Sequence, residues 1–397
     1  MVTRLSSAAV PLAIAVMITT VVLSACGGDG DDQPVLADVT PQPGRQPTHT
    51  PPPTLITSTT TAATLVFIRD DDLWVAPLDG SGKPRAITSA SIGARYAGYA
   101  LRPDGGIDLF YLSQLEENRE LFDEVEFGVF RVGLEGGDSE ELFRFSSDSA
   151  HLVGADVAAD GLRIVYADVD ALILRDLDSG EETILARSRW ILAGDGSYIR
   201  TDMLTSPIWS PTGERVYSSM FAGPDTVVSV IIDLPPRPIT VVDIRYPGHR
   251  GSWSPDGSQL CLTSGDIYDG GLTLYDVTTH DQIDVLAGGM LPDRIEGEKS
   301  SVAGCAWSED GRLAVGYTPI EREPHRVFIL DEQLALVDQS ELYTPSPGVI
   351  DWLPDGSGVV VSRRNTDGES FSAGIYRPGG GIEYLPFEAD RVVAVIP

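Results

Sequence analysis

The chain has 397 residues, of which 42% are hydrophobic and 22% are charged, and these proportions argue against a wholly disordered chain and against a protein with many membrane spans. Its 59 acidic and 28 basic residues give a formal net charge of −31, and a surface this negative repels the phosphates of a nucleic acid. Five histidines and three cysteines are too few to favour a His/Cys metal cluster or a disulfide-dense scaffold. The 41 glycines and 28 prolines favour many short strands over long helices.

The N-terminus has the pattern of an export signal. An uncharged apolar stretch, residues 5–25, follows Arg4 and ends in Leu23-Ser24-Ala25-Cys26. This ending resembles the lipobox of bacterial lipoproteins, which implies a signal peptide over residues 1–25 and a lipid anchor on the Cys26 thiol. More than one acyl chain on that cysteine would make the anchoring stable. The alternatives are a plain transmembrane anchor or an ordinary signal peptide in which Cys26 has no role.

Residues 26–62 have the composition of a tether. They are rich in Gly and Asp and then in Pro and Thr, with no apolar period, so they cannot bury enough surface to offset the entropy of ordering. We expect a disordered stalk that is partly extended at its prolines and holds the following domain away from the membrane.

A turn motif recurs six times after the tether, and its final glycines are about 50 residues apart, which is typical of propeller blades. Proline fixes φ, aspartate caps the turn, and glycine supplies a positive φ before a β-run. The six copies are Leu101–Gly105, Val157–Gly161, Trp209–Gly213, Trp253–Gly257, Trp307–Gly311 and Trp352–Gly356. The predicted strands that follow them are Ile107–Leu112, Leu162–Ala167, Arg215–Ser219, Gln259–Thr263, Leu313–Tyr317 and Gly358–Ser362.

Each unit continues into a second pair of predicted strands, most clearly at Leu272–Asp276 and Gln282–Leu286. A four-stranded sheet of this kind must stack on its neighbours to bury its faces. The Trp-Ser-Pro-Asp-Gly copies resemble the repeats of TolB-like β-propellers over residues 64–397. The repeats are WD-like only in this loose sense, because Gly248-His249 stands alone and the Trp-Asp signature is absent. The resemblance implies an all-β propeller and says little about function.

The blade count follows from the two ends of the domain. A set without an inner strand comes first, at Thr64–Ile68, Asp72–Pro77 and Pro84–Thr88, and an orphan strand, Val392–Ile396, comes last. Joining them closes a seven-bladed ring over residues 63–397 and removes the free sheet edges. A six-bladed ring is the alternative, and it requires one of these sets to be an insertion.

The same count assigns the loops to two faces. The tight-turn face carries the turns after the inner strands and the last hairpin of each blade. The long-loop face carries the other connections, which include Ser113–Glu126, Ala186–Thr205, Gly288–Ser301 and Arg363–Phe371. Long loops on a rigid scaffold often hold binding residues. The candidate partner-binding residues in them are Arg189, Trp190, Tyr198, Arg200, Arg294, Arg363 and Arg364. The alternative is that these arginines only pair with local carboxylates.

Motifs for catalysis and metal binding are absent from the sequence. There is no Gly-x-Ser-x-Gly elbow, no His-Glu-x-x-His and no phosphate-binding loop. His280 falls in an outer hairpin, so the histidines cannot all reach the axis, and we expect no His metal site. Asp70-Asp71-Asp72, or Asp168 with Asp170, could hold a structural Ca²⁺, although such acidic runs are mostly solvated turns.

Two cysteines remain after Cys26. Cys261 lies in the second strand of one predicted blade and Cys305 in the inner strand of the next, so they could form a disulfide outside the cytoplasm. The alternative is two buried thiols that act as small hydrophobic side chains. We expect the four motif tryptophans to pack between blades.

These features predict a monomeric, lipid-anchored protein of the bacterial envelope, on either bacterial membrane. We expect it to bind envelope proteins as an interaction or scaffolding module, with no enzymatic activity and no nucleic-acid binding. One alternative is a propeller lyase or hydrolase that acts on a saccharide or a peptide-derived substrate. Another is a small-ligand or ion sensor. The propeller axis discriminates between them, because an enzyme needs titratable groups that converge there.

Overall fold

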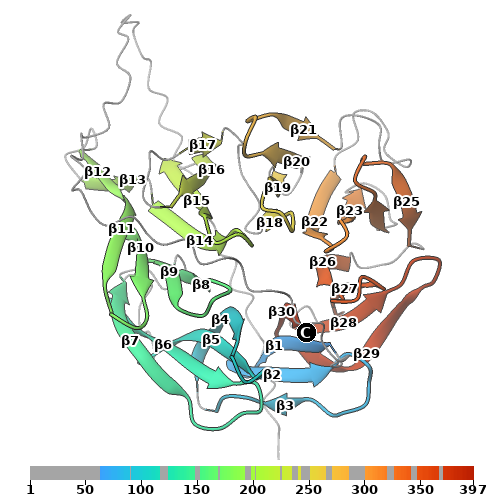
Figure 1. Ribbon diagram of the computed structural model, residues 1–397, viewed down its shortest axis with the longest axis horizontal. Helices are drawn as coiled ribbons and strands as arrows, with labels where there is room; N and C mark the ends of the chain where they lie inside the picture. The colour runs from blue at the N-terminus through green and yellow to red at the C-terminus, as the bar shows by residue number, and fades with distance from the viewer. Residues whose placement is uncertain are drawn as a thin grey trace, which may run out of the picture. The chain divides into compact units, whose positions relative to one another are not determined.

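The structure is a computed structural model. It describes residues 63–89, 91–116, 124–147, 153–168, 170–192, 198–201, 203–223, 226–234, 240–242, 251–264, 271–285, 300–319, 326–340, 347–365 and 370–397. Within these residues the regular structure is all β, in seven four-stranded antiparallel sheets and one two-stranded hairpin. The seven sheets surround a common axis as the blades of a propeller (Figure 1). The predicted fold class and the predicted seven blades are therefore confirmed, and the six-bladed alternative is wrong.

The blades are numbered along the chain, and each is given from its inner to its outer strand. Blade 1 consists of β30 (Arg391–Ile396), β1 (Thr64–Arg69), β2 (Asp72–Pro77) and β3 (Arg85–Ala86), and blade 2 of β4 (Ile92–Leu101), β5 (Ile107–Gln114), β6 (Val125–Gly133) and β7 (Glu140–Ser147). Blade 3 consists of β8 (Gly154–Val157), β9 (Arg163–Ala167), β10 (Ala171–Asp176) and β11 (Glu182–Arg187). Blade 4 consists of β14 (Met203–Trp209), β15 (Arg215–Gly223), β16 (Thr226–Asp233) and β17 (Thr240–Val242).

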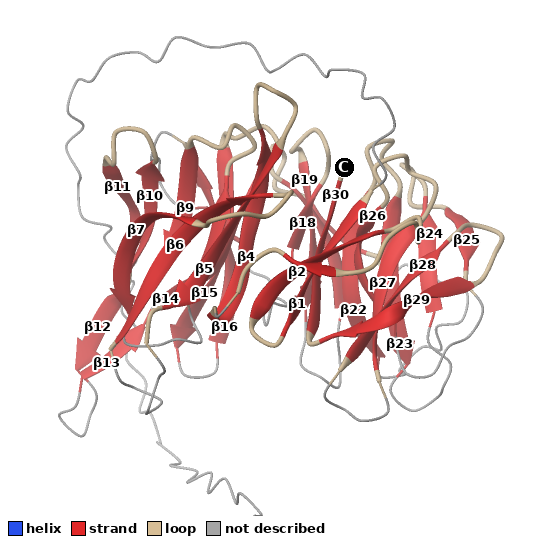
Figure 2. Ribbon diagram, turned by 90° about the horizontal axis from the view of Figure 1, so that it is seen from below, coloured by secondary structure: helices blue, strands red, loops and turns tan. Residues whose placement is uncertain are grey.

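Blade 5 consists of β18 (Gly251–Trp253), β19 (Gln259–Ser264), β20 (Gly271–Asp276) and β21 (Gln282–Asp284). Blade 6 consists of β22 (Ser300–Trp307), β23 (Leu313–Pro319), β24 (Arg326–Leu330) and β25 (Leu336–Gln339). Blade 7 consists of β26 (Pro347–Trp352), β27 (Val359–Arg364), β28 (Phe371–Tyr376) and β29 (Ile382–Ala389). In Figure 2 the turn between β10 and β11 and the C-terminal end of β30 lie at the upper rim, so the tight-turn face points upward in that view.

The C-terminal strand closes the ring, as predicted. β30 pairs antiparallel with β1, with Phe67 opposite Val392 and Thr64 opposite Ile396. The Phe67 ring stacks on Phe387 of blade 7 with a centroid distance of 5.0 Å, so an aromatic contact crosses the closure. The first and last segments of the domain therefore share one blade, and no inner position of the ring is left open.

The six motif turns are built as the sequence predicts. Every final glycine has a positive φ, including Gly257 at +67°. In that turn the Gly257 N–H donates to the Ser254 carbonyl at 2.8 Å. The Asp256 Oδ1 accepts the Ser258 N–H at 3.0 Å. The turn therefore satisfies its own polar groups, and a side chain at Gly257 would be strained.

Three of the four motif tryptophans join neighbouring blades by a repeated hydrogen bond. Each indole N–H donates to the carbonyl of the residue that precedes the motif in the previous blade. The three bonds are Trp209 to Asp156 at 3.0 Å, Trp253 to Ile208 at 3.3 Å and Trp352 to Ala306 at 3.0 Å. The three indoles are at most 6% exposed, so the expected packing role is confirmed for them.

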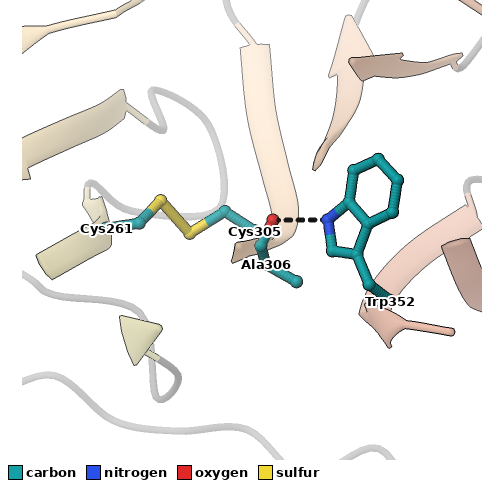
Figure 3. The surroundings of a disulfide bond; sticks show 4 residues. All are labelled: Cys261, Cys305, Ala306 and Trp352. Atoms are coloured by element: carbon teal, nitrogen blue, oxygen red, sulfur yellow. Dashed lines mark hydrogen bonds between the residues drawn. A yellow bond between two sulfur atoms is a disulfide. The ribbon is translucent and has the colours of Figure 1, made fainter. Parts of the chain in front are cut away.

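The boundary between blades 5 and 6 differs from the three boundaries that have this tryptophan hydrogen bond. Within the part of the chain that the structure describes, the buried Trp307 Nε1 has no hydrogen-bond partner, although the equivalent acceptor would be the Ser252 carbonyl. A disulfide joins Cys261 of β19 to Cys305 of β22 across this boundary, with the Cα atoms 6.6 Å apart. Figure 3 shows this disulfide beside the regular Trp352 to Ala306 bond of the next boundary. The covalent link therefore lies where the hydrogen-bonded link is missing.

Two further features bear on the predicted domain plan. A two-stranded hairpin, β12 (Arg189–Leu192) and β13 (Tyr198–Thr201), lies between blades 3 and 4, where the sequence predicts only a long loop. The predicted signal peptide and tether lie outside the described residues. None of the described segments is a helix long and apolar enough to cross a membrane.

Candidate site at the propeller axis

The inner strands approach one another closely around the axis because small residues stand at equivalent positions. A Cβ added at Gly304 of β22 would lie 2.4 Å from the Val349 carbonyl oxygen of β26. A Cβ at Gly98 of β4 would lie 2.6 Å from Val157 of β8, and one at Gly154 would lie 3.2 Å from the Ser206 backbone nitrogen. All three glycines stand three residues before the first motif residue. The motif repeat therefore extends into the inner strands and draws them together.

Polar and charged side chains stand on the inner strands of four blades. They are Arg95, Tyr96 and Tyr99 of β4, Asp156 of β8, Asp351 of β26 and Arg391 of β30. Burial raises the pKa of Tyr96, and negative charge on Tyr99, Asp156 and Asp351 raises it further. These carboxylates belong to blades 3 and 7 and Tyr96 belongs to blade 2, so the three can act on one another only where the inner strands converge (Figure 1).

The carboxyl groups of Asp156 and Asp351 both have raised pKa values. Burial raises the pKa of Asp156 to about 7, although the Trp209 and Val157 N–H groups oppose the shift, and the Trp209 N–H lies 2.7 Å from Oδ2. Burial likewise raises the pKa of Asp351 to about 7, opposed by the Trp352 N–H. Each aspartate stands directly before the first residue of a turn motif. Groups with such pKa values are able to exchange protons near neutral pH.

The two axial tyrosines stay protonated. Burial is the main cause that raises the pKa of Tyr96, followed by Tyr99 and the two aspartates. Burial, Asp351 and Glu309 raise the pKa of Tyr99. The buried Tyr96 hydroxyl has no hydrogen-bond partner among the described residues. A buried hydroxyl without a partner is costly in a folded protein, so this group is available to a ligand or to water.

Two arginines stand at the ends of inner strands that open on the long-loop face. The Arg95 Nη1 donates to the Val153 carbonyl at 2.6 Å, and its guanidinium lies 5.9 Å from the Phe127 ring centroid. Desolvation lowers the pKa of Arg95, and repulsion by Arg391 lowers it further. The Arg391 side chain reaches solvent, and the protein around it still lowers the pKa of its guanidinium by desolvation. Both guanidinium groups therefore belong to the long-loop ends of their inner strands.

The structure distributes the predicted partner-binding residues away from this axial group. Arg189, Trp190, Tyr198 and Arg200 lie on the β12–β13 hairpin, where Trp190 pairs with Arg200. Arg363 and Arg364 end β27, with the Arg363 guanidinium 4.0 Å from the Tyr384 ring centroid and Arg364 exposed. Arg294 lies outside the described residues. Arg363 therefore makes a cation–π contact, whereas the alternative interpretation predicted that it pairs with a nearby carboxylate.

Two of the aspartates that were predicted as possible Ca²⁺ ligands accept hydrogen bonds within the protein. The Asp168 Oδ1 accepts the backbone N–H groups of Asp170 and Ala171 at 2.7 and 2.6 Å. Asp72 accepts the Thr88 hydroxyl at 2.8 Å. Across the described ranges, no three His, Cys, Asp or Glu side chains are grouped so that they could hold a metal ion. His280 lies in the outer β20–β21 hairpin as expected, with Nδ1 2.6 Å from the Tyr275 hydroxyl.

The axial residues are not among the binding residues predicted from the sequence, although the sequence carries two signals for them. Asp156 and Asp351 are charged residues inside otherwise apolar inner strands, each at the position before the motif. Charged residues at such positions are rarely buried without a reason. The placement of Arg95 and Arg391 on neighbouring inner strands had no local signal, because it depends on how the ring closes.

Comparisons with known proteins are consistent with this architecture. No protein-family model and no curated protein sequence matches the chain. An oligogalacturonate lyase from Vibrio parahaemolyticus is similar in structure with a TM-score of 0.54 at 14% identity, over 82% of this chain and 85% of the lyase. A putative 6-phosphogluconolactonase from Bacteroides fragilis gives a TM-score of 0.50 at 14% identity, over 86% and 99% of the two chains. TolB from Acinetobacter baumannii gives 0.43 at 14% identity, over 83% and 80%.

At these identities the similarity concerns the fold alone. The chain is a seven-bladed β-propeller with polar groups converging at its axis.

Proposed function

We propose that this protein is a lipid-anchored propeller of the bacterial envelope that acts by binding, and that its ligand or partner meets the axis at the long-loop face. The observations that carry the proposal are the positions of Arg95 and Arg391 toward the long-loop ends of their inner strands, and the buried Tyr96 hydroxyl, which has no hydrogen-bond partner among the described residues. Maintaining desolvated charges and a buried hydroxyl without a partner costs stability, and such costs are concentrated at functional sites.

Two features support an extracytoplasmic location. The sequence before residue 27 has the lipobox pattern, with Cys26 as the acylated residue. The Cys261–Cys305 disulfide is a bond that persists outside the reducing cytoplasm. Cys26→Ser should release the protein from membranes or leave it as an uncleaved precursor. Normal processing and attachment of that variant would contradict the anchor.

The binding face is tested by photo-crosslinking in the membrane-anchored protein. A photoreactive residue at position 364, which is exposed at the end of β27, reports on the long-loop face. Position 377 is the matched control, because Arg377 is exposed in the β28–β29 turn of the same blade on the opposite face. We expect adducts at position 364 and none at position 377. Adducts confined to position 377 would show that binding occurs on the tight-turn face and would contradict the proposal.

The axial carboxyl groups support a second candidate function. Asp156 and Asp351 have pKa values of about 7 beside Tyr96, and such groups can serve as general acid and base. The lyase of similar fold makes oligogalacturonate a rational first substrate to assay. If the protein is such an enzyme, Asp351→Asn removes turnover while substrate binding remains. Binding without turnover by the wild-type protein supports the first proposal instead.

A further inference from the structure

We propose that a groove between blades 1 and 7 binds a small organic acid with an apolar body. The groove has a volume of about 460 Å³ and lies on the outer side of the ring, between the β2–β3 turn and β29 (Figure 1). Small-molecule sites have volumes of roughly 300 to 1,000 Å³, so the groove is large enough for such a ligand. The inference goes beyond the proposed function, because none of the axial residues lines the groove.

The short outer strand of blade 1 leaves the groove open. β3 has two residues and pairs only with Trp74 and Val75, so no outer strand covers the end of β2 at Pro77. Three of the lining residues are prolines, at positions 77, 84 and 386, and they have no backbone N–H. They cannot donate hydrogen bonds to an added strand, so the groove is poorly suited to a β-strand of another chain.

The lining is apolar apart from two cations. Its apolar side chains are the three prolines, Leu385 and Phe387, and the Phe387 ring is held by stacking on Phe67 with a centroid distance of 5.0 Å. None of the lining side chains carries a hydroxyl, amide or carboxyl group. A sugar would lose the hydrogen bonds of its hydroxyl groups here, and a cationic ligand would find no carboxylate in the lining. The groove therefore favours a ligand with an apolar body.

The two cations, Arg69 and Lys83, indicate the charge of the ligand. The Arg69 guanidinium donates to the Glu388 carbonyl and lies 5.0 Å from the Trp74 ring centroid, so the partners that hold it are neutral. Lys83 is exposed in the β2–β3 turn. Among the described residues, neither of these two side chains forms an ion pair.

Two positive charges without paired carboxylates are unusual in a chain with a formal net charge of −31. An anionic group on the ligand would compensate them, and the Lys83 ammonium can donate a charge-assisted hydrogen bond to it. Arg69 then contributes its charge while it keeps its present contacts. An apolar lining with two cations at one groove therefore matches an apolar body that carries one carboxylate.

Two kinds of apolar acid are separated by matched probes. An aliphatic acid is represented by octanoate and an aromatic acid by phenylpropionate, each against its neutral amide. Acetate has the charge without the apolar body, and glucuronate has the charge on a polar body. Binding to the mature protein is measured by calorimetry at constant ionic strength. We expect at least one apolar acid to bind at least about tenfold more tightly than its amide, acetate and glucuronate.

Lys83→Gln should remove the preference for the acid over its amide. Arg364→Gln is the matched control and should keep the preference, because Arg364 is an exposed arginine at the end of β27 and does not line the groove. Equal binding of an apolar acid and its amide, equal or tighter binding of acetate or glucuronate, or an unchanged preference in Lys83→Gln would each overturn the proposal. Failure of both apolar acids to bind would also overturn it.

Discussion

Asp156 in blade 3 holds Trp209 in blade 4 by two hydrogen bonds. Its Oδ2 accepts the Trp209 backbone N–H at 2.7 Å, and its carbonyl accepts the Trp209 indole N–H at 3.0 Å. A buried carboxyl group on an inner strand therefore also joins two blades. This relationship links the protonation of the axis to the stability of the ring.

Stability should fall as the pH rises from about 4 to about 7. An aspartate in the unfolded chain ionises near pH 4, whereas Asp156 in the folded protein keeps its proton until about pH 7. In that window the unfolded state binds fewer protons than the folded state, so raising the pH favours unfolding. Asp156→Asn keeps an acceptor for the Trp209 N–H and removes the titration.

At about pH 8 we therefore expect Asp156→Asn to raise the free energy of unfolding by about 2 kcal/mol, measured by urea denaturation. Its stability should also change less than that of the wild type between about pH 5 and pH 8. An equal pH dependence in the two proteins would show that Asp156 is ionised in the folded state. Below about pH 4 both proteins should lose stability, because hydrogen bonds such as that from Ser254 lower the pKa of Asp256 and are lost on protonation.

The disulfide should compensate for the missing tryptophan bond at the boundary of blades 5 and 6. Its cysteines are 44 residues apart in sequence, and closing such a loop stabilises a fold by about 2 to 4 kcal/mol. We expect Cys261→Ala/Cys305→Ala to lower the melting temperature by several degrees. Dithiothreitol should lower it to a similar extent in the wild type only. A melting temperature that is equal in both proteins would contradict this compensating role.

The close packing of the inner strands is tested at two glycines that share a positive φ. Gly304 has φ +106° and its added Cβ would lie 2.4 Å from the Val349 carbonyl oxygen, whereas Gly80 has φ +71° and open space around it. Gly80→Ala should cost only the backbone term, about 1 kcal/mol. Gly304→Ala should cost at least about 3 kcal/mol, because backbone of the next blade must move. Equal costs would mean that the inner strands can separate easily.

The sequence was sufficient for the parts of the fold that repeat locally. The positive φ of Gly257 follows from the chemistry of one turn, and the pairing of Val392–Ile396 with the first blade follows from counting strands. The axial site was not predictable in the same way. That β30 with Arg391 becomes the neighbour of β4 with Arg95 depends on how seven blades close around the axis, and no single repeat encodes that arrangement. The same holds for the Trp307 indole, whose motif predicts a bond that the structure lacks.

The hairpin β12–β13 illustrates a different limit. Its strands are four residues each, and their pattern is too short to be distinguished from an extended loop. Its residues Trp190 and Arg200 remain candidates for partner contact on the hairpin. The prediction that these two residues bind a partner does not depend on the axial site.

Charge reversal at two exposed arginines is the sharpest test of whether binding occurs at the axis on the long-loop face. Arg391→Glu alters the axial end, and Arg377→Glu makes the same charge change on the tight-turn face. The measurement is the yield of crosslinked partner or ligand captured from envelopes by each anchored variant, at equal melting temperature. The account predicts that Arg391→Glu loses capture and that Arg377→Glu retains it. Retained capture by Arg391→Glu together with its loss in Arg377→Glu would contradict the account.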